Sequence, residues 1–154
     1  MSKHKLYSLA RVRSEDQRRE LQQLENANVC TFCESGLTYT GVPIVKKGKH
    51  WFIAKNKFPY EGTTSHYMGI YREHVCSYAE VAPEAWPELF RLLKEFAGPE
   101  CSIAMRSGDP DRSCATISHF HVHAFSGVVG HPKTHEEIIM HLGYKADRPA
   151  QKKK

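Results

Sequence analysis

Five consecutive residues, His119 to His123 with the sequence HFHVH, constrain the fold of this chain more than any other segment. In an extended strand successive side chains point to opposite faces, so the three histidines share one face while the two apolar residues point to the other. We therefore predict a strand over Thr116 to Phe125. Solvated strand faces usually carry Lys, Thr or Glu, so three aligned imidazoles indicate a functional surface. They could hold a metal, or one could be a nucleophile that the others orient.

The composition is that of a single globular domain. The chain has 154 residues, of which 40% are hydrophobic and 25% charged, enough for one core without disulfides. No apolar run approaches the roughly 18 residues of a membrane span, and we see no secretory signal, so we expect a cytoplasmic protein with no membrane segment. The net charge of +5 favours anionic ligands such as nucleotides.

The other segments predict an α+β domain. Ser14 to Asn28 carries strong helix formers after a serine that can cap them, and Ala82 to Phe96 places apolar residues at helical spacing. A last helix is predicted over His135 to Leu142. Strand composition is found at Gly41–Val45, His50–Asn56, His66–Tyr71 and Cys101–Arg106. We expect these strands to form an antiparallel sheet, in which Cys101–Arg106 and the histidine strand make a hairpin.

The cysteines indicate a metal site more than disulfides, because five is an odd number and the expected compartment is reducing. Cys30-x-x-Cys33 lies in a turn-rich stretch, with two thiolates spaced to bind one tetrahedral metal. Two free thiols or a redox pair are the alternatives, although the βαβ context of a redox motif is missing. Cys76, Cys101 and Cys114 have no partner at metal spacing, and we expect them to be buried small residues.

Three segments resemble the histidine-triad family, whose members are nucleotide hydrolases and transferases. The histidine strand continues with two apolar residues and so matches the family's His-apolar-His-apolar-His-apolar-apolar signature. His66 to His74 resembles its other histidine segment, in which a histidine opens a strand and a second follows eight residues later. Asn56 to Tyr60, with the sequence NKFPY, is similar to an element of the branch that contains dinucleoside-polyphosphate phosphorylases. The resemblance runs from Cys30 to Phe125.

The resemblance implies a histidine-triad fold, in which a long helix packs on an antiparallel sheet, and commonly a homodimer. We divide the chain accordingly into an N-terminal helical extension (residues 1–29), a histidine-triad domain (30–144) and a basic tail (145–154).

The resemblance also implies a mechanism. The central His121 would attack the α-phosphate of a nucleotide, expected to be an adenine nucleotide, and form a covalent nucleotidyl-histidine that water, phosphate or another acceptor resolves. His123 and His66 would orient the nucleophile and assist proton movement. The implied nucleotide-binding residues are Asn56, Ser107 and Thr116.

The loop before the histidine strand departs from the family pattern. Relatives often have an Asn-containing turn where this chain has Arg106-Ser107-Gly108, and a glycine near the position of Cys114. Arg106 or Arg112 could supply charge to the phosphate instead.

A zinc site is implied by one branch of the family. There, a cysteine pair joins the histidine that ends the upstream segment and the first histidine of the His-apolar-His-apolar-His signature. The matching residues are Cys30, Cys33, His74 and His119. A closed set of four ligands leaves no position for water, so this zinc would be structural.

Two other functions are compatible with the sequence. One is a catalytically idle, regulatory protein that binds nucleotides, although the retained His121 argues against it. The other is a nucleic-acid-binding zinc module, suggested by the cysteine pair and the basic tail Lys152–Lys154, but a clustered basic-aromatic face is absent. The leaving group stays open, because dinucleoside polyphosphates, phosphoramidates, adenylyl conjugates and nucleotide sugars all present the same α-phosphate.

Overall fold

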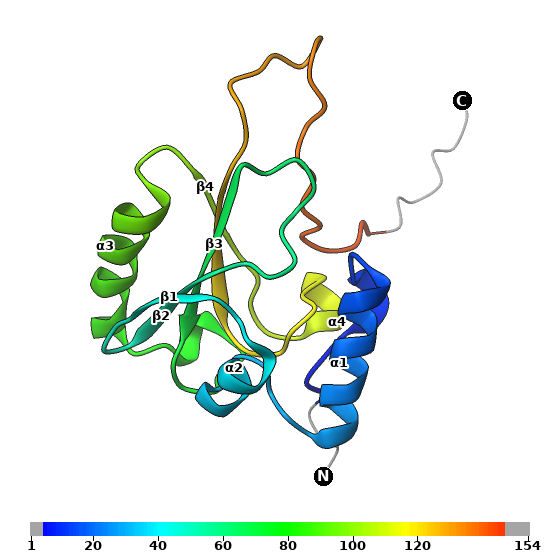
Figure 1. Cartoon of the computed structure of the whole chain (residues 1–154), viewed down its shortest axis with the longest axis vertical. Coiled ribbons are helices and arrows are strands. Elements are labelled where there is room, and N and C mark those ends of the chain that lie inside the picture. Colours follow the sequence, from blue (N-terminus) through cyan, green and yellow to red (C-terminus); the bar gives the residue numbers. More distant parts are fainter. Residues whose placement is uncertain (1–4, 147–154) are drawn as a thin grey trace, which may run out of the picture.

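The chain is built around one antiparallel sheet, seen in a computed structural model that describes residues 5–146 (Figure 1). The strand order is β1-β2-β3-β5-β4. The strands are β1 (Ile44–Lys47), β2 (Trp51–Lys55), β3 (Ser65–Tyr71), β4 (Ser102–Met105) and β5 (His121–Ser126). The helices are α1 (Glu15–Ala27), α2 (Glu34–Thr40), α3 (Trp86–Ala97) and α4 (Pro110–Ser113), with 3-10 turns η1 (Leu9–Arg11), η2 (Tyr78–Glu80) and η3 (Pro83–Ala85). The α+β class is confirmed, as is the β4–β5 hairpin.

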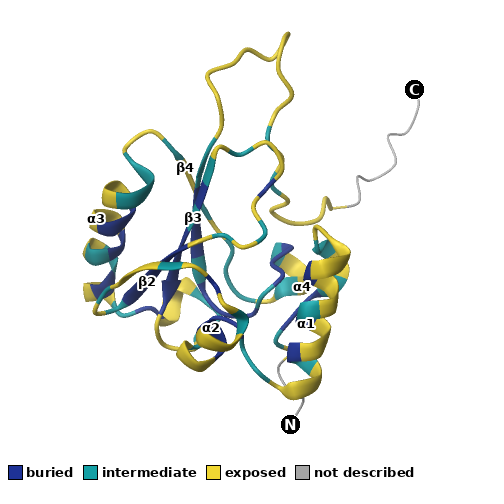
Figure 2. Ribbon diagram, in the orientation of Figure 1, coloured by how far each residue is buried: buried dark blue, intermediate teal, exposed yellow. Residues whose placement is uncertain are grey.

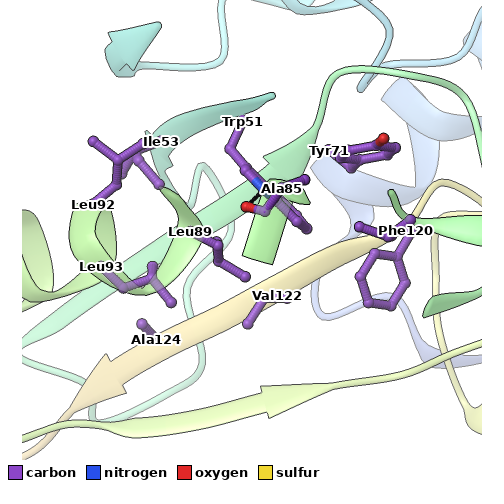
Figure 3. Close-up of a cluster of buried hydrophobic side chains, with 11 residues drawn as sticks. Trp51, Ile53, Tyr71, Ala85, Leu89, Leu92, Leu93, Phe120, Val122 and Ala124 are labelled. Atoms are coloured by element: carbon purple, nitrogen blue, oxygen red, sulfur yellow. Dashed lines mark hydrogen bonds between the residues drawn. The ribbon is translucent and has the colours of Figure 1, made fainter. Parts of the chain in front are cut away.

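Helix α3 covers one face of the sheet, as predicted, and encloses the main core (Figure 3). Gly69 on β3 allows the close approach, because a Cβ there would lie 2.3 Å from Cδ1 of Leu89. The indole of Trp51 donates to the carbonyl of Ala85, 2.8 Å away, and so satisfies its one polar group. The core cluster comprises Trp51, Ile53, Tyr71, Val81, Ala85, Leu89, Leu92, Leu93, Phe120, Val122 and Ala124.

Helix α2 helps to cover the opposite face of the sheet. Phe52 and Ala54 alternate along β2 with the residues that face α3, and they pack with Phe32 and Leu37 beneath α2. Both faces of β2 are therefore covered, which explains why its first four residues are all buried (Figure 2).

Helix α1 confirms the predicted N-terminal helix, and it packs on the domain on the side away from α3 (Figure 1). The Ser14 side chain caps it by accepting from the Gln17 backbone N–H. Leu21 and Leu24 are buried against Tyr7, whose hydroxyl donates to the Val29 carbonyl at 2.6 Å. The described part of the N-terminal extension thus contributes core residues. Its separation from the domain at residue 30 stays a prediction.

Two strand predictions need correction. β5 begins at His121 instead of Thr116, because the segment before it pairs with the N-terminal segment: Tyr7 forms a bridge with Ile117, and Ser8 N–H donates to the Thr116 carbonyl. His119 therefore precedes the strand. β1 begins at residue 44, since helix α2 and its αL cap at residue 41 occupy the preceding residues.

The helix predicted over His135 to Leu142 is wrong. One turn forms at the start, where the His135 N–H donates to the His131 carbonyl, but it does not continue. Ile139 and Leu142 are 66% and 65% exposed. A short helix is marginal without a packed apolar face, so this segment stays irregular.

Within residues 5–146, none of the helices combines the length and the apolar character that a membrane crossing requires. The basic residues 152–154 lie outside the described residues.

Candidate active site and metal centre

The three histidines assigned to catalysis, which we call the triad, come from two strands. Two of them lie on one face of β5, and the third, His66, comes from the neighbouring strand β3. His121 and His123 point away from the α3 core, into which Phe120 and Val122 are packed as predicted. His66 joins them because the register pairs residue 66 with 125 and residue 68 with 123, which makes His66 and His123 diagonal neighbours. Nε2 of His66 lies 2.9 Å from Nδ1 of His123.

The hydrogen bonds of His66 set the proton positions in this pair. The Tyr60 backbone N–H donates to Nδ1 of His66 at 3.2 Å, so the proton of the neutral ring is on Nε2. That proton is donated to Nδ1 of His123, which leaves His123 with its own proton on Nε2. Burial, together with the positive charges of Arg13 and Arg106, lowers the pKa of His66 to about 4. The ring is therefore neutral at pH 7.

His121 has the opposite arrangement of its two nitrogens. Its Nδ1 lies 2.7 Å from the carbonyl oxygen of His119, and a carbonyl only accepts, so Nδ1 carries the proton. Nε2 of the neutral ring keeps its lone pair. Desolvation is the main reason why the pKa of His121 is lowered to about 3, with Arg106, His119 and Arg13 adding to the effect. The edge-to-face contact with Phe32, 4.9 Å between ring centroids, holds the ring in place.

A pocket opens beside His121 and His123. It is lined by parts of the chain that are distant in sequence, including α1, the loop after β2, β3 and the loop before β5. Its lining residues are Arg13, Gln17, Glu20, Leu21, Thr31, Phe32, Val42, Asn56, Lys57, Phe58, Met68, Arg106, Thr116, Ile117, His121 and His123.

The three predicted nucleotide contacts are placed differently. Asn56 and Thr116 both line the pocket. Asn56 accepts from the Phe58 N–H at 2.9 Å through Oδ1, and its Nδ2 lies 3.5 Å from Nδ1 of His66, the ring nitrogen without a proton. Ser107 is not among the described residues that line this pocket, because its hydroxyl is turned toward η2, where it accepts from the Tyr78 N–H at 2.9 Å.

The structure also distinguishes the two candidate arginines. Arg106 lines the pocket, donates to the Tyr60 hydroxyl and contributes to the lowered pKa of His121. Arg112 is exposed on α4 and is outside the pocket lining. Of these two arginines, only Arg106 is therefore placed to meet a phosphate beside the triad.

The contribution of the N-terminal extension was missed by the sequence analysis. Gln17 and Leu21 of α1 line the pocket, as does Arg13 just before the helix. They fall outside the family resemblance. One sequence signal was available: Gln17 is four residues before Leu21 and seven before Leu24, which places all three on the same helix face. In the structure, Gln17 is only 3% exposed.

The four predicted metal ligands come together in one cluster. The ligand atoms of Cys30, Cys33, His74 and His119 all lie within 4.8 Å of one another. Nδ1 of His119 lies 3.4 Å from Sγ of Cys30 and 3.8 Å from Sγ of Cys33, and Nδ1 of His74 lies 3.4 Å from Sγ of Cys33. Zinc–ligand bonds of about 2.0–2.3 Å in a tetrahedron give ligand separations of this size.

The surroundings of the cluster also suit a structural zinc ion. Nε2 of His119 donates to the Tyr71 carbonyl at 2.6 Å, which leaves Nδ1 free to bind a metal. Gly36 lets α2 pack on the cysteine turn, since a Cβ there would lie 1.9 Å from the Cys30 carbonyl oxygen. Burial and the neighbouring Cys33 raise the pKa of the Cys30 thiol to about 12, so a bound cation is needed for it to ionise. The donor set fits structural zinc.

The other three cysteines are free thiols, and their predicted burial is confirmed for one of them only. Cys114 is buried, while Cys76 and Cys101 are only partly so.

The five-stranded sheet, with one long helix on one face and the triad on the other, defines the histidine-triad fold. A scan against protein-family models and a search of curated proteins both gave no match. Solved structures do match, as the following three show.

A histidine-triad nucleotide-binding protein from Sulfolobus tokodaii matches with a TM-score of 0.54 and 18% identity, over 75% of this chain and 81% of its own. A histidine-triad hydrolase from Clostridium thermocellum matches with a TM-score of 0.51 and 19% identity, over 68% and 96%. A zinc-bound histidine-triad protein from Mycobacterium smegmatis matches with a TM-score of 0.50 and 17% identity, over 67% and 78%. The fold that the sequence resemblance implied is confirmed.

Proposed function

We propose that this chain is a zinc-supported histidine-triad enzyme, a nucleotide hydrolase or nucleotidyltransferase that attacks the α-phosphate of an adenine nucleotide. One observation carries the proposal: the His119 carbonyl holds the proton on Nδ1 of His121, so Nε2 has its lone pair beside the pocket. A neutral imidazole fixed in this tautomer is a competent nucleophile toward phosphorus.

In the first step, Nε2 of His121 forms a bond to the α-phosphorus while the bond to the leaving group breaks. The electron pair goes to the leaving group. His123 carries its proton on Nε2, beside the same pocket, and can donate it to the leaving atom or to a phosphate oxygen. His66 keeps His123 in this tautomer through their hydrogen bond.

In the second step, water, phosphate or another acceptor attacks the nucleotidyl-histidine and releases His121. Asn56, on the pocket wall, is proposed to bind the ribose, and Thr116, only 7% exposed, to contact the phosphate. Ser107 has its hydroxyl engaged at η2, so we propose no phosphate contact for its side chain. Zinc would be held by the four ligands named above. It would stabilise the segment that leads into β5 without taking part in the chemistry.

Turnover of a substrate panel tests this function. We would incubate the protein with diadenosine polyphosphates, an adenosine phosphoramidate and a nucleotide sugar, each with and without inorganic phosphate, and identify products by mass spectrometry. Release of a monophosphate without added phosphate would indicate a hydrolase, and a phosphate-dependent diphosphate product would indicate a phosphorylase. Binding with no turnover of any compound would favour the idle, regulatory alternative.

The proposal extends to a homodimer located in the cytoplasm. The edge strand β4 exposes Ile103 and Met105, at 46% and 38%, and α3 exposes Phe90 at 50%. Apolar side chains on an edge strand and on the adjacent helix suit a contact between two copies. Light scattering at micromolar concentration would give the mass of a dimer, or of a monomer if this part of the proposal fails.

A further inference from the structure

Arg13 brings a positive charge to the pocket from outside the segments that resemble the family. It stands immediately before Ser14, the N-cap of α1, and its Nε donates to the Phe58 carbonyl at 2.9 Å. Its guanidinium carbon lies 4.8 Å from the centroid of the Tyr60 ring. The side chain is solvent-exposed, and its two Nη groups have no hydrogen-bond partner among residues 5–146. Arg13 is therefore held in place through Nε, and its two Nη groups remain available to donate hydrogen bonds to a ligand.

Arg106 reaches the same tyrosine from the other side of the pocket. Its guanidinium donates to the Tyr60 hydroxyl and, at 2.5 Å, to the carbonyl of Cys114. Its Nε is buried and lacks a hydrogen-bond partner within the described part of the chain. Two guanidinium groups thus converge on Tyr60, one over the ring and one at the hydroxyl.

The charges of this pair lack a direct salt-bridge partner among residues 5–146. In the described part of the chain, every salt bridge involves other basic residues, and neither Arg13 nor Arg106 pairs with a carboxylate. Even Lys57, which also lines the pocket, is paired with Glu20 at 2.5 Å. Two neighbouring like charges with no carboxylate in salt-bridge contact repel each other, and a bound anion would lower that cost.

The position of the pair selects the kind of anion. Both arginines line the pocket beside His121 and His123, and both also line a second hollow, which includes Glu61, Glu136 and Glu137. The pair therefore lies between the nucleophile and the second hollow. The carboxylates of that hollow can accept hydrogen bonds from the hydroxyl or amino groups of a sugar or base.

We propose that Arg13 and Arg106 bind the phosphate next to the α-phosphate on the leaving-group side, so that the preferred substrates carry a phosphoanhydride. This inference rests on the function proposed above and deepens it. As His121 attacks, the bridging P–O bond breaks and its electron pair stays on the departing phosphate. The guanidinium pair would stabilise that growing negative charge. A phosphoramidate has an amine as leaving group and gains nothing from the pair.

Substitution of Arg13 tests the proposal through a ratio of two activities. We would measure kcat/KM for diadenosine tetraphosphate and for an adenosine phosphoramidate in the wild type, Arg13→Ala, Arg13→Lys and the control Arg112→Ala. Loss of one hydrogen-bond donor to a developing anion corresponds to roughly a 100- to 1,000-fold decrease. We expect Arg13→Ala to lose that much with the tetraphosphate and at least tenfold less with the phosphoramidate, Arg13→Lys to recover part of the loss, and Arg112→Ala to match the wild type.

Two outcomes would overturn this role of Arg13. Equal losses for both substrates would show that Arg13 only supports the fold around Tyr60, and unchanged kinetics for Arg13→Ala would show that it does not meet the substrate.

Binding separates this inference from the function on which it rests. In titration calorimetry the wild type should bind ATP more tightly than AMP, and Arg13→Ala should reduce that preference at least tenfold even if the protein turns nothing over. An unchanged ATP preference in Arg13→Ala would reject the arginine pair, whereas a lack of turnover with a reduced preference would reject only the catalytic proposal.

Discussion

The zinc cluster and the triad lie side by side, and their histidines differ in which ring nitrogen the backbone holds. In His119 the Tyr71 carbonyl takes the Nε2 proton, so Nδ1 points to the cysteines. In His121 the His119 carbonyl takes the Nδ1 proton, so Nε2 remains for the pocket. One hydrogen bond to a carbonyl thus leaves Nδ1 of one imidazole free for a metal and Nε2 of the other, the proposed nucleophile, free beside the pocket.

The comparison is tested most strongly by His121→Ala. We expect turnover to fall by several orders of magnitude, because the covalent intermediate cannot form, while nucleotide binding and zinc content are kept. Single-turnover kinetics and metal analysis of the same preparation measure both. His131→Ala, at an exposed histidine outside both clusters, is the matched control. Near-normal turnover of His121→Ala would remove this residue from the mechanism.

Substitution of a zinc ligand should have the opposite effect on zinc content from His121→Ala, because the metal is then lost. Cys30→Ser should release zinc and lower the free energy of unfolding by about 3–5 kcal/mol, since a buried structural metal stabilises the folded state directly. Metal analysis and chemical denaturation would measure this, with Cys101→Ser as the control thiol. If the wild type purified without chelators contains no zinc, the structural assignment fails.

The pH dependence of stability should come in part from His66, a member of the triad. The pKa of His66 is about 4 in the folded protein, below its ordinary 6.5, so the unfolded chain binds a proton more readily between these values. Stability from this group is complete above pH 6.5 and is lost as the pH falls toward 4, by about 3 kcal/mol in all. Denaturation at pH 7.5 and pH 5 in the Cys30→Ser background, which removes the metal, should show this slope.

His66→Asn in the same background should reduce the slope without abolishing it, because burial also lowers the pKa of His121, to about 3. An equally steep dependence in that variant would mean that another group is responsible.

The smallest expected effect concerns the helix that covers the triad pocket. Ser14→Ala removes the N-cap of α1 and should cost about 1 kcal/mol of unfolding free energy with no change in zinc content. Thermal unfolding and metal analysis give both values. Loss of zinc in this variant would show that α1 supports the metal side as well, and the two regions would then be less independent than the structure indicates.

Much of this arrangement could be predicted from the sequence, because it depends on local spacing. Alternation placed His121 and His123 together, with Phe120 and Val122 in the core beneath α3. The Cys-x-x-Cys spacing indicated half of a metal site, and the family resemblance supplied its two histidines. The start of β5 could not be predicted, since the residues before it pair with Tyr7 and Ser8, more than 100 positions earlier.

By itself, the sequence determined which residues face the same way on a strand or helix, because backbone geometry repeats every two residues in strands and about every 3.6 in helices. Tertiary structure alone decided the rest. It joined Arg13 to Arg106 across Tyr60, turned Ser107 away from the pocket, and left 135–142 irregular. These outcomes depend on packing and hydrogen bonds between distant segments, which no local pattern of residues encodes.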